Sequence, residues 1–213
     1  MISREDVLYA GSDYYISPNE TVPDDLIVKT QWAIESIKLS KAWDFSSGSS
    51  QVLVGIIDTG IDGTHPDLNA SIRVDLSRDF SNGEEGWIPG KYIIDNQITV
   101  GPLRINDNIS NNSNYGKNTV AIYAPGSNIL TTSVDGYEHV SGTSLSAPYV
   151  TGVAALLLSL NEDLTAAQLK TAILEGADDI VIDVPDTSPG ATETDRVEQD
   201  VLKLNALVLL NMF

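Results

Sequence analysis

Two residues stand where the chain could carry out acid–base and nucleophilic chemistry, Asp58 and Ser144. Asp58 ends the apolar run QVLVGIID of residues 51–58, and the turn signal Thr59-Gly60 follows it. A run this rich in β-branched residues predicts a strand that is buried on both faces, as in a parallel sheet. A carboxylate at the C-terminal end of such a strand lies where α/β sheets place functional groups, although a turn-capping aspartate fits the same position.

Ser144 belongs to the segment SGTSLSAP of residues 141–148. The apolar stretch at residues 146–159 predicts a buried helix, with Pro148 in its first turn. Ser144 is therefore expected at or near the N-terminus of that helix, where N–H groups without helical partners favour developing negative charge. A hydroxyl at this position is suited to act as a nucleophile beside an oxyanion site, and it is equally suited to act as an ordinary N-cap.

The segments around both residues resemble the aspartate and serine signatures of the subtilisin family. The resemblance rests on GIIDTGIDGTHPDL around Asp58 and on SGTSLSAPYVTGVAALL around Ser144. Shorter matches follow the family's order at residues 113–132, 164–177 and 203–207. The resemblance implies a serine endopeptidase in which Ser144 attacks the scissile carbonyl and Asp58 orients a histidine that acts as the general base.

The segment that carries this histidine in the family has no counterpart here. Family members have an HGTHVAG-like motif between the Asp and Ser segments, then strands of the substrate pocket, then an Asn that completes the oxyanion hole. In this chain RDFSNGEEG (78–86) runs through WIPGKYIIDNQ directly into ITVG (98–101). The resemblance therefore implies an internal deletion near residues 81–97, on the order of 90 residues or three βα units of roughly 30 each. We expect an enzyme that is inactive or severely impaired.

Two histidines are present in the whole chain, His65 and His139. His65 follows Asp58 by seven residues, in a GTHPDL segment that matches a family position outside the triad, and it is predicted to be a loop histidine. His139 precedes Ser144 by five residues and would reach it only if the intervening chain doubled back. We therefore expect neither ring to act as the base.

The composition excludes several other classes of protein. Acidic residues outnumber basic ones 30 to 12, for a formal net charge of −18, which excludes a nucleic-acid binder with a basic face and argues against docking on anionic lipid. The absence of cysteine excludes disulfides, cysteine-based zinc sites and thiol catalysis. No apolar run approaches the roughly 18 residues of a membrane-spanning helix, so no membrane partner is expected.

No cofactor is required for the predicted chemistry. Calcium binding stays open without an assignable site, because the family's calcium sites rest partly on the missing region and Asp67 alone does not make one. The sequons at Asn19, Asn69, Asn108 and Asn111, in a chain without cysteine, favour an extracellular or cell-surface protein over a cytosolic one.

The rest of the pattern predicts the elements that surround these residues. Residues 1–30 are polar and rich in turn formers, and we expect an extended arm that resembles the tail and junction of a pro-segment. Residues 31–213 are expected to form the subtilase-like domain. Its other predicted elements are a helical turn at Ser40–Asp44, a short strand at 72–80, short strands at Ile98–Val100 and Val120–Tyr123, a helix opened by a capping box at Thr165 and closed by Gly176, a solvated acidic loop at 178–200 and a helix at Val201–Phe213.

Together these elements predict an α/β fold with three layers and a mainly parallel sheet, resembling a contracted subtilisin domain. Without the missing strands, residues 51–57 must pair directly with Ile98–Val100 or leave an apolar sheet edge exposed, which favours self-association. Three functions stay open at this point. They are a protease-like domain that binds peptide or protein chains without cleaving them, a peptidase whose histidine comes from a partner chain or an unrecognised position, and a truncated gene product.

Overall fold

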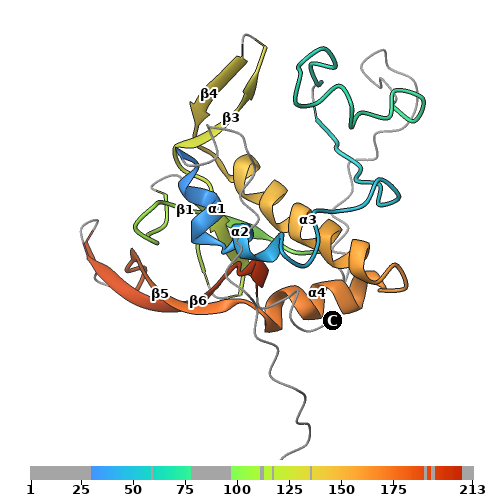
Figure 1. The fold of residues 1–213 in the computed structure, drawn as a ribbon. Helices are drawn as coiled ribbons and strands as arrows, with labels where there is room; N and C mark the ends of the chain where they lie inside the picture. Colours follow the sequence, from blue (N-terminus) through green and yellow to red (C-terminus); the bar gives the residue numbers. More distant parts are fainter. Residues whose placement is uncertain are drawn as a thin grey trace, which may run out of the picture.

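The computed structural model describes residues 30–58, 60–77, 97–110, 113–116, 118–134, 136–189, 191–192 and 195–207. The arm expected at residues 1–30 and the deletion expected near 81–97 lie outside these residues, apart from Thr30 and Gln97. Figure 1 shows the elements in chain order. They are α1 (Trp32–Ser36), α2 (Leu39–Ala42), β1 (Val100–Leu103), β2 (Ile122–Pro125), β3 (Ile129–Ser133), β4 (Gly136–Val140), α3 (Thr143–Leu160), α4 (Ala166–Glu175), β5 (Asp178–Pro185) and β6 (Arg196–Lys203).

A four-stranded sheet in the order β1-β2-β6-β5 forms the centre of the described chain. β1 and β6 both pair with β2 in parallel, and β5 pairs with β6 in the antiparallel direction. β3 and β4 form a separate antiparallel hairpin that leads into α3. The sheet is therefore mixed and mainly parallel, as the sequence predicted, and the strands expected at Ile98–Val100 and Val120–Tyr123 begin two residues later than expected.

Three layers result from the alternation of side chains along β2. Ile122 and Ala124 enter the main core, which they share with α3, α4 and the residues around α1 and α2. Tyr123 points to the opposite face and joins a second cluster, where Ile109 and Tyr115 of the loop at residues 104–120 cover the sheet. Helices, sheet and this loop thus form the three layers, and the predicted α/β fold class is confirmed.

α3 is the central helix of the main core, and only one side of it is buried. Its buried side carries Val150, Val153, Leu156 and Leu157, whereas the side at residues 147–148 and 151–152 is exposed. The helix that the sequence predicted to be buried is thus buried along one side only, because a helix that packs on one face of a sheet meets it along a single stripe. Among the described residues, α3 alone is long and apolar enough to cross a membrane by length and composition.

α4 begins and ends where the sequence predicted. The Gln168 N–H donates to Thr165 Oγ1 at 3.3 Å, and the Thr165 N–H donates to Gln168 Oε1 at 2.9 Å. These reciprocal bonds form the expected capping box, and Gly176 is the C-cap. Local hydrogen bonding is thus sufficient to set both ends of this helix.

The strand predicted at residues 51–58 does not form. Residues 52–57 are irregular, and Ile56 and Ile57 are 72% and 103% exposed. Of the two arrangements expected for this segment, the pairing with Ile98–Val100 is absent from the described sheet, in which β1 is the last strand. An apolar run becomes a strand only where a neighbouring strand satisfies its backbone N–H and C=O groups, and the described sheet provides no such neighbour for this segment.

Two further predictions are wrong in the C-terminal third. The acidic loop expected at 178–200 is largely the β5–β6 hairpin, because Ile182 and Val184 alternate with exposed residues and bury one face of β5 in the second cluster. The helix expected at Val201–Phe213 instead begins as the end of β6, and residues 208–213 lie outside the description. The short strand expected at 72–80 forms turns as far as residue 77.

The packing of α3 predicts how two leucines of the same helix differ. Leu157 is fully buried in the main core, so Leu157→Ala should lower the free energy of unfolding by roughly 2–5 kcal/mol through the cavity that it leaves. Leu160 is 40% exposed, and Leu160→Ala serves as the matched control with an expected change of about 1 kcal/mol or less. Urea denaturation followed by circular dichroism measures both, and equal losses would contradict the described packing.

Candidate functional site

Ser144 lies in the first turn of α3 and is exposed. Gly142 is the N-cap of the helix, so Ser144 does not have the capping role that the sequence left open. The Gly142 N–H donates to the carbonyl oxygen of Gly126 at 2.8 Å, which ties the start of α3 to the end of β2. The predicted position at a helix N-terminus is therefore confirmed, and the hydroxyl is accessible to solvent.

Asp58 is also exposed, at a bend that ends the irregular segment 52–57. Its predicted place at the C-terminal end of a buried strand depended on the strand at 51–58, which does not form. Asp58 and Ser144 therefore sit on separate segments, one before the described sheet and one after β4. In the described part of the chain, the ring nitrogens of His65 contact Asp67 and Gly136, and Nδ1 of His139 faces the carbonyl oxygen of Asn128.

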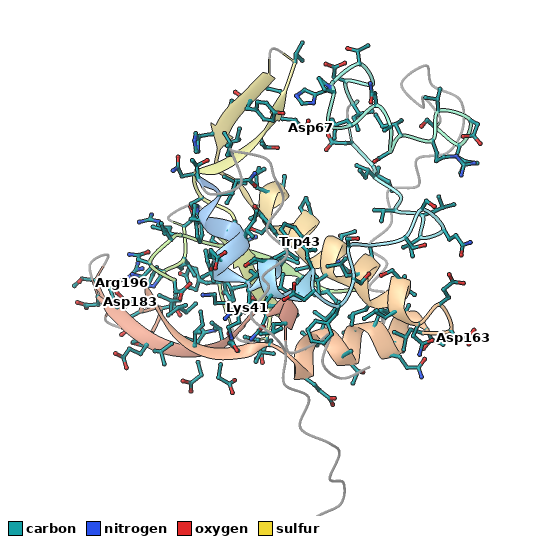
Figure 2. All side chains as sticks on the ribbon, in the orientation of Figure 1. Lys41, Trp43, Asp67, Asp163, Asp183 and Arg196 are labelled. Atoms are coloured by element: carbon teal, nitrogen blue, oxygen red, sulfur yellow. The ribbon has the colours of Figure 1, made fainter. Side chains whose placement is uncertain are left out.

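His65 is 5% exposed and packs against the β3–β4 hairpin. The Asp67 N–H donates to its Nδ1 at 3.2 Å, so its Nε2 carries the proton and donates to the Gly136 carbonyl oxygen at 3.1 Å. Tyr137 meets the imidazole edge-on, with ring centroids 5.3 Å apart, and its hydroxyl donates to Asp67 Oδ2 at 2.7 Å. Figure 2 labels Asp67 where the loop faces this hairpin. Nε2 of His65 thus joins the loop to the hairpin, and Nδ1 accepts a hydrogen bond from within the loop itself.

A small cavity of about 230 Å³ lies beside this contact, lined by residues 60–62, His65, Leu68 and 132–134. Asp62 is its carboxylate, and hydrogen bonds from the side chain and backbone of Thr64 hold the pKa of Asp62 below its ordinary value. The Thr64 hydroxyl lies 2.7 Å from Asp62 Oδ1. Asp62 is therefore ionised at neutral pH and stabilises its own turn. Among the residues that the structure describes, no three acidic or histidine side chains form a metal-binding group.

His139 is exposed on β4 and turns towards the tight turn that precedes β3. Its Nδ1 lies 3.4 Å from the carbonyl oxygen of Asn128, a residue with a φ of 54°. The same carbonyl accepts a hydrogen bond from Trp32 Nε1 at 3.3 Å. β4 ends at Val140 and α3 begins at Thr143, so the chain does not double back to bring His139 over Ser144.

The arrangement therefore gives Ser144 a helix N-terminus without a histidine. Within the described part of the chain, no hydrogen bond joins its hydroxyl to His65 or His139. A serine hydroxyl is barely ionised at neutral pH and needs an adjacent base to become a nucleophile. The sequence did not anticipate Gly136 and Tyr137 as partners of His65, because only the tertiary fold brings the β3–β4 hairpin to this loop.

The sequence of the chain is similar to those of known proteases. A profile of the subtilase family matches residues 78–201. The chain is 35% identical over 154 residues to a subtilisin-like serine protease, Rho m 2.0101, of Rhodotorula mucilaginosa, covering 64% of this chain and 45% of that protein. It is 28% identical over 242 aligned positions to alkaline protease 2 of Aspergillus fumigatus, covering 97% of this chain and 48% of that protein. The chain thus spans about half the length of these relatives.

Two solved structures are also similar to parts of the chain. A cold-adapted subtilisin-like serine proteinase is 34% identical and covers 53% of this chain and 37% of its own, with a TM-score of 0.41. The nisin leader peptidase NisP from Lactococcus lactis is 24% identical and covers 56% and 34%, with a TM-score of 0.42.

The family match does not depend on the structural comparison. The matched region extends over more than half of the chain and includes the segment around Ser144. The alignment with alkaline protease 2 has 242 positions, more than the 213 residues of this chain. The chain belongs to the subtilase family of serine proteases.

Proposed function

We propose that this chain is a subtilase domain that retains Ser144 and Asp58 but hydrolyses peptide bonds at no measurable rate, and that binds peptide or protein chains instead. The observation that supports this most directly is the engagement of both histidines elsewhere. His65 uses both ring nitrogens in contacts with Asp67 and Gly136, and His139 faces the carbonyl oxygen of Asn128.

The chemistry of acyl transfer explains why peptide hydrolysis fails when neither histidine reaches Ser144. The histidine of a serine protease accepts the hydroxyl proton and then delivers it to the leaving amine. Loss of a triad member leaves only about 10³–10⁴-fold acceleration over water, from binding and the oxyanion hole. Loss of an oxyanion-hole side chain removes roughly a further 10²–10³-fold. In the proposed domain, the chain provides neither the histidine base nor the oxyanion-hole side chain. Ser144 then has only the N–H groups and the dipole at the start of α3 to stabilise negative charge.

The internal deletion near residues 81–97 is part of the same proposal. The alignment with alkaline protease 2 exceeds this chain by 29 positions (242 against 213), which supports a missing internal segment but is fewer than the roughly 90 residues expected, and it does not locate the segment. In the proposed domain, residues 31–213 form one unit and no cofactor is required. An extracellular or cell-surface location fits the sequons and the absence of cysteine.

The absence of a general base predicts the rate of peptide hydrolysis. We expect the purified chain to release products from casein and from a chromogenic peptide no faster than Ser144→Ala does, because neither protein has an activated hydroxyl. The Ser144→Ala variant is the matched control, since it removes the hydroxyl from an exposed position. Turnover that is clearly faster in the unmodified chain would show that a histidine is provided after all.

The ionisation of Ser144 can be tested without a substrate. A fluorophosphonate probe labels a serine only when its hydroxyl is activated, so we expect no labelling of Ser144 at neutral pH, with an active subtilisin-type protease as the positive control. Stoichiometric labelling that disappears in Ser144→Ala would overturn the proposal. In that case, loss of labelling in His139→Ala or in His65→Ala would identify the ring that serves as base.

Binding of an unfolded protein chain can be measured separately from its hydrolysis. Fluorescein-labelled, unfolded casein should bind the chain saturably in an anisotropy titration, without a time-dependent fall in anisotropy from cleavage. Heat-unfolded chain at the same concentration controls for non-specific binding. If the folded chain shows no more binding than this control, the peptide-binding function is wrong and a truncated product without such a function is favoured.

A further inference from the structure

β5 is the outermost strand of the described sheet, on the side opposite to β1. Within the described residues β5 pairs with β6 alone, and the pairing extends over its whole length from Asp178 to Pro185. Figure 1 shows the β5–β6 hairpin extending past α1 and α2 to one side of the molecule. An edge strand of this length presents backbone N–H and C=O groups to which a further strand can be added.

The hydrogen bonds of the hairpin determine which groups of β5 point outward. The Asp186 N–H donates to the Asp195 carbonyl oxygen at 2.9 Å, which continues the β5–β6 ladder by one pair. In an antiparallel ladder, residues that bond to the partner strand alternate with residues whose N–H and C=O groups point away from it. Because Asp186 bonds to the partner, the even-numbered residues of β5 do so as well. The backbone groups of Asp179, Val181 and Asp183 therefore point outward.

The pairing of β6 with β2 agrees with this assignment. The Leu204 N–H donates to the Tyr123 carbonyl oxygen at 2.8 Å, so the residues on either side of Lys203 face β2. The backbone of Lys203 itself then faces Asp178, its partner in β5. Alternation along β5 from Asp178 again directs the odd-numbered residues outward.

Two contacts limit the part of β5 that is open. At its first residue, Lys38 Nζ lies 3.1 Å from Asp178 Oδ2. Further along, the Arg196 guanidinium donates to the Asp183 carbonyl oxygen at 2.9 Å. Between them, no hydrogen bond of the described chain engages the outward N–H and C=O groups of residues 179–181. These groups and the outward N–H of Asp183 are here called the free edge.

The side chains beside the free edge form an exposed, acidic face. The opposite face of β5 is buried in the second cluster through Ile182 and Val184. Val181 lies at the centre of the exposed face and is 55% exposed. Exposed carboxylates surround it, and they belong to Asp179, Asp183, Glu198 and Asp200. Arg196 contributes a cation near Asp183, so negative charge is in excess on this face.

These charges select the kind of chain that can be added. If β5 of a second copy paired antiparallel about Val181, Asp179 of each copy would lie opposite Asp183 of the other, and like charges directly opposite are destabilising. An added strand with Lys or Arg at alternate positions places cations opposite these carboxylates instead, which stabilises the pairing. Its intervening side chains lie on the side of Ile180 and Ile182, where β-branched apolar residues fit.

We propose that the free edge of β5 binds an extended basic segment of another protein as an added strand. Its Lys or Arg side chains lie over the acidic face, and its apolar side chains lie beside Ile180 and Ile182. The surface is separate from Ser144, because β6 lies between β5 and β2, whereas α3 packs on β1 and β2. This inference goes beyond the function proposed above and does not depend on whether Ser144 is active.

A fluorescein-labelled, blocked peptide of alternating lysine and valine tests the proposal in an anisotropy titration with the full chain. It should bind saturably, and its affinity should fall as salt rises, because salt screens the attraction between opposite charges. The absence of saturable binding at low ionic strength would show that the proposal is wrong.

Methylated peptides separate strand pairing from attraction by charge alone. Two versions carry methyl groups on the backbone nitrogens, one at the lysines and one at the valines, and both keep every charge. The version whose methyl groups face β5 loses its backbone donors, so it should bind about tenfold more weakly than the other. Equal binding of the unmodified peptide and both versions would overturn the proposal, because it would show adsorption to negative charge without strand pairing.

A proline substitution tests the same hydrogen bonds from the side of the chain. Val181→Pro removes an outward N–H and leaves the bonds to β6 in place, because an edge strand tolerates proline where its N–H faces away from the sheet. It should weaken peptide binding by about tenfold. Val181→Thr keeps the N–H and is the matched control, and circular dichroism verifies the fold of both. Equal affinities of the two variants would contradict pairing at the free edge.

A charge substitution tests the acidic face. Asp179→Asn should weaken binding of the unmodified peptide by about threefold, because it removes one carboxylate beside the added strand. Asp163→Asn is the matched control with the same change in net charge, since Asp163 is an exposed residue that Figure 2 shows on the opposite side of the molecule from Asp183. Equal effects of the two substitutions would overturn the role of this face.

Light scattering distinguishes a basic partner from a second copy. We expect the full chain alone not to dimerise through β5, because the formal net charge of −18 and the opposed carboxylates repel a second copy. A dimer that Val181→Pro abolishes and Val181→Thr preserves would show that β5 pairs with its own copy and that the proposal is wrong.

Discussion

The close packing of α3 against the end of the parallel strands is the constraint on which the remaining geometry depends. Gly126 follows β2 where a side chain would collide with Ser146 of α3 and with Pro102 of β1. The absence of a Cβ at this position lets helix and sheet approach, and the Gly142 N–H bonds to the Gly126 carbonyl at the same place. This contact fixes the start of α3, and with it the position of Ser144.

The same packing explains why the structure positions the two candidate residues, Ser144 and Asp58, so differently. α3 packs on β1 and β2 in the main core, so Ser144 in its first turn has a defined position. Asp58 belongs to a segment that precedes β1 and lacks a strand neighbour, so nothing in the described sheet carries it to the start of α3. His65 is placed by contacts with Gly136 and Asp67 that leave neither ring nitrogen for a serine. These contacts support the proposal that Ser144 has no general base.

Ion pairs connect segments of this strongly acidic chain that are distant in sequence. Lys203 Nζ lies 2.7 Å from Asp107 Oδ1 and joins β6 to the loop that covers the second face of the sheet. Lys38 Nζ lies 3.1 Å from Asp178 Oδ2 and joins the α1–α2 segment to the start of β5. In Figure 2, Arg196 and Asp183 lie together near the far end of the β5–β6 hairpin, with Arg196 Nε 3.6 Å from Asp183 Oδ2. These three cations therefore offset repulsion between acidic side chains where two segments of the chain meet.

The sequence by itself determined the features that depend on neighbours within a few residues. The capping box at Thr165 and Gln168 needs only one turn of chain, and the signature around Ser144 identifies both the family and the helix start. Only the tertiary structure determined that residues 51–58 form no strand, that β5 pairs with β6, and which residues His65 contacts. A strand forms only where a second strand satisfies its backbone N–H and C=O groups, and that second strand can lie far away in the sequence. The partners of a buried histidine are likewise set by residues distant in sequence. Neither kind of interaction can be inferred from neighbouring residues alone.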